Sequence, residues 1–223
     1  SLLDEWLKTI EKILKKYPHK LREAKCYEDE KIFIQDRRQK VKLKNYKDLV
    51  NYPKVVIDIR DEADSGMIDL FNVDRLLQKN YIFKELFASE PFKEILNFND
   101  YSLSVSNVNA YVNSGNTTTR GFHFDSERNQ IKFFIYLTDV INFNDGPYTF
   151  VSKSQKDKSS IRINKKLSYG LKNETEAPLL NFENINPIFA NRGSLIISNQ
   201  SGFHRGFPQS KDGYRAILAI NCT

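Results

Sequence analysis

Three histidines occur in the chain, and two of them stand in segments that can bind a metal ion. His123 lies two residues before Asp125 in RGFHFD, and side chains two apart in an extended backbone point to the same face. His204 lies in SGFHRGFP, and a strand over the preceding GSLIIS would bring it to the same point. Two imidazoles and one carboxylate on one face of an octahedral ion leave three positions open. We therefore expect His123, Asp125 and His204 to bind one divalent transition metal.

The short HxD spacing also arises by chance, so it is weak evidence by itself. Arg215 is a second feature that strengthens the interpretation. It follows His204 in GYRAILAI, where a strand would place it on one face with Ile217 and Ala219. If that face is interior, the guanidinium has to meet an anion there. Arginine binds a carboxylate through two parallel hydrogen bonds. A dicarboxylate that chelates the metal at one end would present its far carboxylate to Arg215.

The elements that position these residues are predicted to be short strands. From about residue 101 the strand candidates are YSLSVSNVNAYVN, QIKFFIYLTDV, PYTFV, GSLIIS and YRAILAI, a succession typical of a β-sandwich or barrel. A polar insertion at about 152–186 interrupts them and has the length of a lid or binding loop.

The first hundred residues are predicted to be largely helical. Apolar residues with a period of about 3.6 indicate an amphipathic helix over 2–17 that ends at Pro18 and packs on a sheet. VVIDI at 55–59 predicts a strand, and 67–98 predicts helices broken near Asn80 and at Pro91. With 223 residues, 40% of them hydrophobic, we expect one domain over 1–223. The expected fold class is mainly β with flanking helices.

Composition excludes several classes of protein. The longest apolar runs are too short to span a membrane, and the N-terminal segment lacks the apolar stretch of a secretory signal, so we expect a cytoplasmic protein. Cys26 and Cys222 form no disulfide framework or zinc motif and are expected to be ordinary thiols. The net charge of +6 fits either a solvated basic surface or attraction to an anionic partner. Composition leaves the oligomeric state open.

From Ser102 to Ile220 the sequence resembles the phytanoyl-CoA dioxygenase-like branch of the iron(II)/2-oxoglutarate-dependent oxygenases. The matching elements stand in the family's order: HFD, IKFFIYLTDV, NDGPYTFVSKSQ, NRGSLIIS, HRGFP and Arg215 on the last strand. The resemblance implies a double-stranded β-helix, that is, a jelly roll with N-terminal helices packed on one sheet.

The resemblance also implies the cofactors and the reaction. They are Fe(II), 2-oxoglutarate and O2, with ascorbate as a stimulating additive, and the products are succinate, CO2 and a hydroxylated substrate. Related halogenases carry a small residue at the carboxylate position, so Asp125 disfavours halogenation. The expected substrate is a small or carrier-bound molecule, for which an anionic group is left open.

Two departures from the family concern the surroundings of the metal. The family commonly has Gly-Ser-His where this chain has Lys153, Ser154 and Gln155, which puts the local mouth of the site in doubt. The family often has a serine that helps hold 2-oxoglutarate where this chain has Gly206, so Arg215 needs another helper.

Weaker candidates surround these motifs. Asn109 and Tyr111 share a strand face with Asn107 and Asn113, which either contacts 2-oxoglutarate or substrate inside the barrel or faces solvent. Arg120 and Arg205 flank the histidine motifs and either receive an anionic substrate or lie on the surface, and His19 is expected on the surface.

Two other functions remain as alternatives. An oxidative demethylase of nucleic acid is disfavoured, because such enzymes show a second arginine soon after the first and AILAINCT follows Arg215 here. A non-catalytic jelly-roll module that binds a metal or ligand has no need of open metal positions. Retention of all three ligands and the arginine argues against it.

Overall fold

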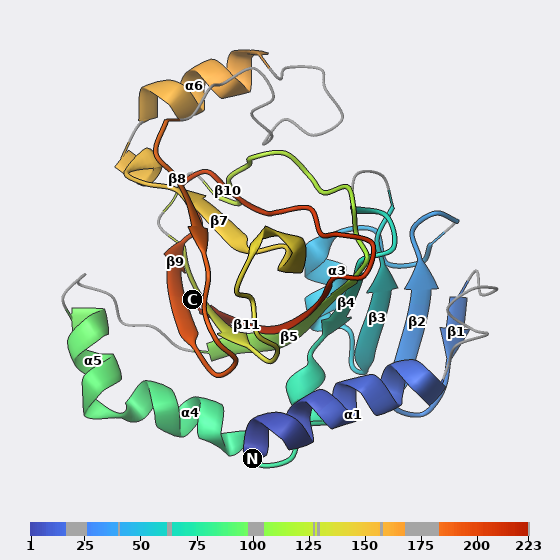
Figure 1. Cartoon of the computed structure of the whole chain (residues 1–223). Helices are drawn as coiled ribbons and strands as arrows, with labels where there is room; N and C mark the ends of the chain where they lie inside the picture. Colours follow the sequence, from blue (N-terminus) through green and yellow to red (C-terminus); the bar gives the residue numbers. More distant parts are fainter. Residues whose placement is uncertain are drawn as a thin grey trace.

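The computed structural model describes residues 1–16, 26–39, 41–61, 64–97, 105–126, 128, 130–156, 158–167 and 183–222. The strands form an eight-stranded sheet of order β1-β2-β3-β4-β5-β11-β6-β9 and a three-stranded sheet of order β10-β7-β8 (Figure 1). The strands of the main sheet are β1 (Cys26–Glu28), β2 (Ile32–Asp36), β3 (Val55–Ile59), β4 (Ile68–Phe71), β5 (Val105–Ser114), β6 (Ile131–Tyr136), β9 (Leu195–Asn199) and β11 (Tyr214–Cys222). The second sheet contains β7 (Tyr148–Val151), β8 (Ile185–Ile188) and β10 (His204–Gly206).

Helices lie at the margins of these sheets (Figure 1). The α-helices are α1 (Leu2–Lys16), α3 (Tyr46–Asn51), α4 (Tyr81–Ala88), α5 (Glu90–Asn97) and α6 (Lys158–Leu167), and the short 3-10 helices are η2 (Val73–Arg75), η3 (Phe143–Asp145) and η4 (Ser154–Lys156). In the described part of the chain, none of the helices has the length and apolar character needed to cross a membrane.

The two faces of β11 show how the layers are built. Ala216, Leu218 and Ile220 are buried in the large core cluster that also contains Trp6 and Ile10 of α1. The alternate residues of β11 face the second sheet, where Ile217 and Ala219 pack with Phe134 and Tyr136 of β6 and with Tyr148 of β7. Because side chains alternate along a strand, one apolar run serves two cores. This arrangement confirms the predicted jelly roll with a helix packed on its outer face.

The N-terminal half contributes more strands than its sequence predicted. Only β3 was expected, whereas β1, β2 and β4 also form and extend the main sheet beside β5. Residues 68–71, predicted as helix, form β4, because this segment pairs antiparallel with β3 on one side and β5 on the other. Such cross-strand pairing overrides weak local preference.

Three other predictions are corrected or limited by the structure. The helix break lies at Ser89, not at Pro91, which stands in the first turn of α5, where a missing backbone N–H costs little. The 152–186 insertion contains η4 and α6 and ends within β8, so it is not a simple polar loop. Its residues 168–182 lie outside the described residues, as do Pro18 and His19.

Candidate metal centre

The two histidines of the predicted triad face each other across a backbone bridge. The amide of His123 donates to the carbonyl of His204 at 3.0 Å, and the amide of His204 donates to the carbonyl of His123 at 2.8 Å. The amide of Asp125 donates to the carbonyl of Gln200 at 3.0 Å, which continues the pairing toward β9. The segment 123–125 is therefore held in extended form against 200–204, as the same-face prediction for His123 and Asp125 required.

Each imidazole is oriented by its own local backbone. Nδ1 of His123 lies 2.9 Å from the carbonyl of Gly121, and Nδ1 of His204 lies 2.9 Å from the carbonyl of Gly202. A carbonyl can only accept, so each neutral ring carries its proton on Nδ1 and keeps a lone pair on Nε2. Burial, followed by the neighbouring charges of His204 and Arg120, lowers the pKa of His123 well below its ordinary value. Burial likewise lowers the pKa of His204. Both rings are thus in the neutral form that binds metals.

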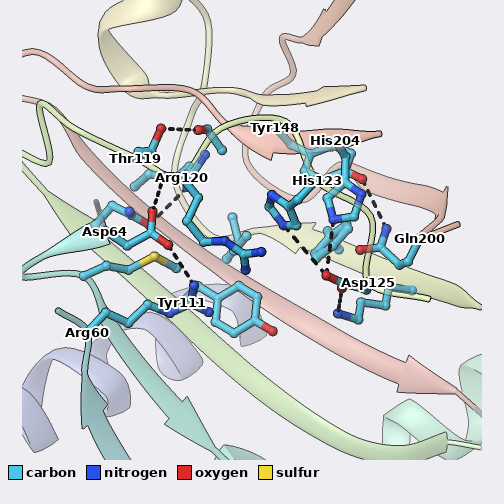
Figure 2. Close-up of a pocket in the computed structure, with 17 residues that line it drawn as sticks. Arg60, Asp64, Tyr111, Thr119, Arg120, His123, Asp125, Tyr148, Gln200 and His204 are labelled. Carbon is cyan, nitrogen blue, oxygen red and sulfur yellow. Dashed lines mark hydrogen bonds and ion pairs between the residues drawn. The ribbon is translucent and has the colours of Figure 1, made fainter. Parts of the chain in front are cut away.

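The three side chains converge on one point (Figure 2). Oδ1 of Asp125 lies 3.7 Å from Nε2 of His123 and 3.8 Å from Nε2 of His204, and all three ligand atoms lie within 4.8 Å of one another. An octahedral ion with bonds of about 2.1 Å holds neighbouring ligands about 3 Å apart, so a small inward movement completes the site. The donor set of two imidazole nitrogens and one carboxylate oxygen fits iron(II).

Lys132 binds the other oxygen of Asp125. Its Nζ lies 2.6 Å from Oδ2, and the Asp125 side chain is 27% exposed whereas Lys132 is buried. Burial would raise the pKa of Asp125, but the charge of Lys132 and its hydrogen bond outweigh the effect of burial and hold the pKa far below its usual range. Asp125 is therefore a carboxylate at neutral pH.

The triad lies in a cavity (Figure 2). Arg215 lines the same cavity. Its walls come from the inner face of the main sheet, from β10 and from the segment before His123. The lining residues are Arg60, Asp64, Met67, Tyr111, Asn113, Thr119, Arg120, His123, Asp125, Lys132, Phe134, Tyr148, Gln200, His204, Gly206, Arg215 and Ile217.

Arg215 is buried on the wall of this cavity, at 3% exposure. Its guanidinium donates to the carbonyl of Gly146 and, at 3.1 Å, to Oδ1 of Asn113, while its Nε has no partner. Among the described residues no carboxylate forms an ion pair with it, and burial lowers its pKa. A buried guanidinium without a counter-ion is costly, so this site fits a bound carboxylate.

Gly206 stands where the family often has the serine that helps hold 2-oxoglutarate, and it lies close to Arg215. A Cβ at position 206 would stand 3.1 Å from Nη2 of Arg215, so even a small side chain would crowd the guanidinium. Asn113 and the carbonyl of Gly146 orient Arg215 instead.

The other predicted residues lie in different places. Tyr111 is on the cavity wall, and burial raises its pKa to about 12. Asn109 is buried outside the lining, where its Oδ1 accepts from Asn107 and from the amide of Asn72, so its contact with a ligand stays a prediction. Arg120 lines the cavity, whereas Arg205 lies outside it and stacks over Phe122 and Phe207.

Several cavity residues were not predicted. Arg60 follows β3 and forms ion pairs with Asp64 and with Asp69 of β4, and the segment that carries these three residues showed no chemical motif. Tyr148 packs its ring 5.7 Å from that of His204, and its hydroxyl contacts Ser198 at 2.7 Å. For Lys132 a signal existed, because on strand IKFFIY it shares a face with Phe134 and Tyr136 and so had to be interior.

Comparison with known proteins supports the fold. No protein-family model matches the chain, and no curated protein matches its sequence. Among solved structures, AviO1 from Streptomyces viridochromogenes Tue57 matches with a TM-score of 0.55 at 12% identity, covering 100% of this chain and 84% of that one. SnoN, the non-heme alpha-ketoglutarate-dependent epimerase from nogalamycin biosynthesis, matches at 0.51 and 12%, covering 75% and 65%. EctD from S. alaskensis, solved with 2-oxoglutarate and 5-hydroxyectoine, matches at 0.50 and 14%, covering 74% and 59%.

The chain shares its fold with AviO1, SnoN and EctD. At identities of 12–14% the likeness concerns the course of the backbone.

Proposed function

We propose that the chain is an iron(II)- and 2-oxoglutarate-dependent oxygenase that hydroxylates a small organic or carrier-bound substrate. The observation that carries the proposal is the pairing of two features in one cavity. His123, Asp125 and His204 present three metal-binding atoms to one point, and Arg215 presents a buried guanidinium that pairs with no carboxylate of the described residues. A metal-binding module needs the first feature only. A 2-oxoglutarate site needs both.

The residues divide the work between metal and cosubstrate. His123, Asp125 and His204 would hold iron(II), which when bound supplies the redox chemistry that O2 requires. Arg215, fixed by Asn113, would hold the far carboxylate of 2-oxoglutarate. Tyr111 lies on the wall of the same cavity and remains neutral at physiological pH, because burial raises its pKa to about 12.

The overall reaction balances without another reductant. One oxygen atom of O2 enters the substrate, which changes from R–H to R–OH, and the other enters succinate as 2-oxoglutarate loses CO2. Asp125 keeps a carboxylate at the metal, which supports hydroxylation over halogenation. The cavity is lined by aromatic, apolar and charged side chains together, which suits a small molecule that carries polar groups.

The direct test combines binding and turnover. Wild-type protein should bind iron(II) or Mn2+ at one site, bind 2-oxoglutarate only when the metal is present, and form succinate from 2-oxoglutarate with O2 and ascorbate. His123→Ala should lose metal binding and succinate formation together. Protein that binds the metal but neither binds nor consumes 2-oxoglutarate would identify a non-catalytic metal-binding module.

A further inference from the structure

Lys132 is a buried cation at the metal centre that the proposed reaction does not use. It lies near the start of β6, with Asn221 of β11 on one side and Ser198 of β9 on the other in the sheet register. Its side chain points into the barrel with Phe134, and it is 9% exposed. A lysine is seldom buried unless it is paired. Its ion-pair partner is Asp125, at 2.6 Å.

This contact divides the two oxygens of Asp125 between different partners. Oδ1 faces the two imidazoles, at 3.7 and 3.8 Å from their Nε2 atoms. Oδ2 receives the hydrogen bond from Lys132. The charge-assisted hydrogen bond holds Oδ2 at Lys132 and leaves Oδ1 as the oxygen that faces the candidate metal site.

We propose that Lys132 is a positioning residue that keeps Asp125 a one-oxygen ligand and thereby preserves three open positions on the metal. The inference rests on the proposed function, because it concerns the same metal site. Two of the open positions are needed for 2-oxoglutarate, which leaves one for O2. A carboxylate released from Lys132 can turn its second oxygen onto the metal and close that last position.

The charge of Lys132 also affects how tightly the metal binds. The ammonium repels a dication and competes with it for the carboxylate, so Lys132 lowers metal affinity while it fixes ligand geometry. An ordinary structural residue has the opposite effect, because its removal loosens the ligands. Removal of Lys132 should therefore maintain or raise the metal affinity if its charge positions Asp125, and should lower the affinity if the side chain only packs.

The experiment uses Mn2+ as the probe and two readouts other than activity. Titration gives the affinity, and water-proton relaxation gives the number of exchangeable waters on the bound ion. Lys132→Met removes the charge at similar length. Lys132→Arg keeps the charge, but its fork can bind both carboxylate oxygens. Arg60→Met is the matched control, because Arg60 lines the same cavity and pairs with Asp64 and Asp69 rather than with a metal ligand.

The two lysine variants should change in opposite directions. Lys132→Met should bind Mn2+ at least as tightly as wild type, with relaxation per bound ion lower by about one third, as one of three waters is lost. Lys132→Arg should bind Mn2+ about tenfold more weakly, because both oxygens are engaged. Arg60→Met should keep the wild-type relaxation per bound ion.

Several results would overturn the inference. Wild-type relaxation in Lys132→Met, or weaker binding in both variants, would show that Lys132 only supports the structure. If Lys132→Met does not fold, a Lys132→Arg variant that binds Mn2+ as tightly as wild type refutes the proposal by itself. Failure of the wild-type protein to bind any divalent metal would instead refute the proposed function.

Discussion

Replacement of Arg215 by methionine should separate 2-oxoglutarate binding from metal binding. Methionine approximates the length of the buried side chain but cannot bind a carboxylate. Arg215 lies within the cavity, donates to Gly146 and Asn113, and has an Nε without a partner. The variant should therefore lose the contact with the far carboxylate while His123, Asp125 and His204 keep their positions.

The magnitude follows from the burial of this contact. Loss of one partner from a buried, hydrogen-bonded charge pair costs about 2–5 kcal/mol. At about 1.4 kcal/mol for each factor of ten, the Kd for 2-oxoglutarate should rise by about 30-fold to a few thousandfold. Arg205→Met serves as the matched control, because Arg205 stacks on Phe122 and Phe207 outside the cavity and should leave this Kd unchanged.

Calorimetric titration of Mn2+-loaded protein measures the Kd for 2-oxoglutarate, and 2-oxobutyrate serves as the control ligand. This 2-oxo acid keeps the metal-chelating end but lacks the far carboxylate, so wild type and Arg215→Met should bind it equally. The reasoning is refuted if the variant weakens both ligands by the same factor, or if it binds 2-oxoglutarate as wild type does. A melting curve confirms that the variant is folded.

Four further predictions concern single side chains. His123→Ala should reduce Mn2+ affinity by at least about 100-fold in a titration, since one of three ligands is lost; wild-type affinity would remove His123 from the site. Gly206→Val should raise the Kd for 2-oxoglutarate without changing that for Mn2+, because a Cβ stands 3.1 Å from Nη2 of Arg215; an unchanged Kd for 2-oxoglutarate would contradict this packing. Asn221→Leu should stabilise the protein by about 1–3 kcal/mol in urea unfolding, because both amide atoms of the buried Asn221 side chain lack partners; a lower stability would show that these atoms are bonded in solution. A thiol reagent at pH 8 should modify only Cys26, which is exposed, because Cys222 is buried and burial raises its pKa to about 12; rapid reaction of two thiols in folded protein would contradict this.

The jelly-roll half could be predicted because its strands carry their own pattern. On β11 the strand period places Arg215 on one face with Ile217 and Ala219, and both neighbours are buried, so the condition that this face be interior is met. The HxD spacing likewise placed His123 and Asp125 on one side of an extended segment. These inferences need only the period of a strand and the cost of burying a charge.

The N-terminal strands could not be predicted in the same way. β1 has three residues and β4 has four, too few to show a period, and one pairing partner of β4 is the distant strand β5. Arg60 and Asp64 reach the cavity only because this part of the sheet forms. Lys132 differs from Arg60 and Asp64, because it could have been predicted. It shares a strand face with the apolar residues Phe134 and Tyr136, just as Arg215 shares one with Ile217 and Ala219.

The backbone bridge between His123 and His204 joins segments about 80 residues apart in the chain. Closing so long a loop costs conformational entropy, and contacts of this separation tend to form late in folding. We therefore expect the candidate metal site to assemble late in folding, after the segments that carry His123 and His204 have paired. Once bound, the ion would tie both ends of this loop together. Slower hydrogen exchange at the amides of His123 and His204 on metal addition would report this closure directly.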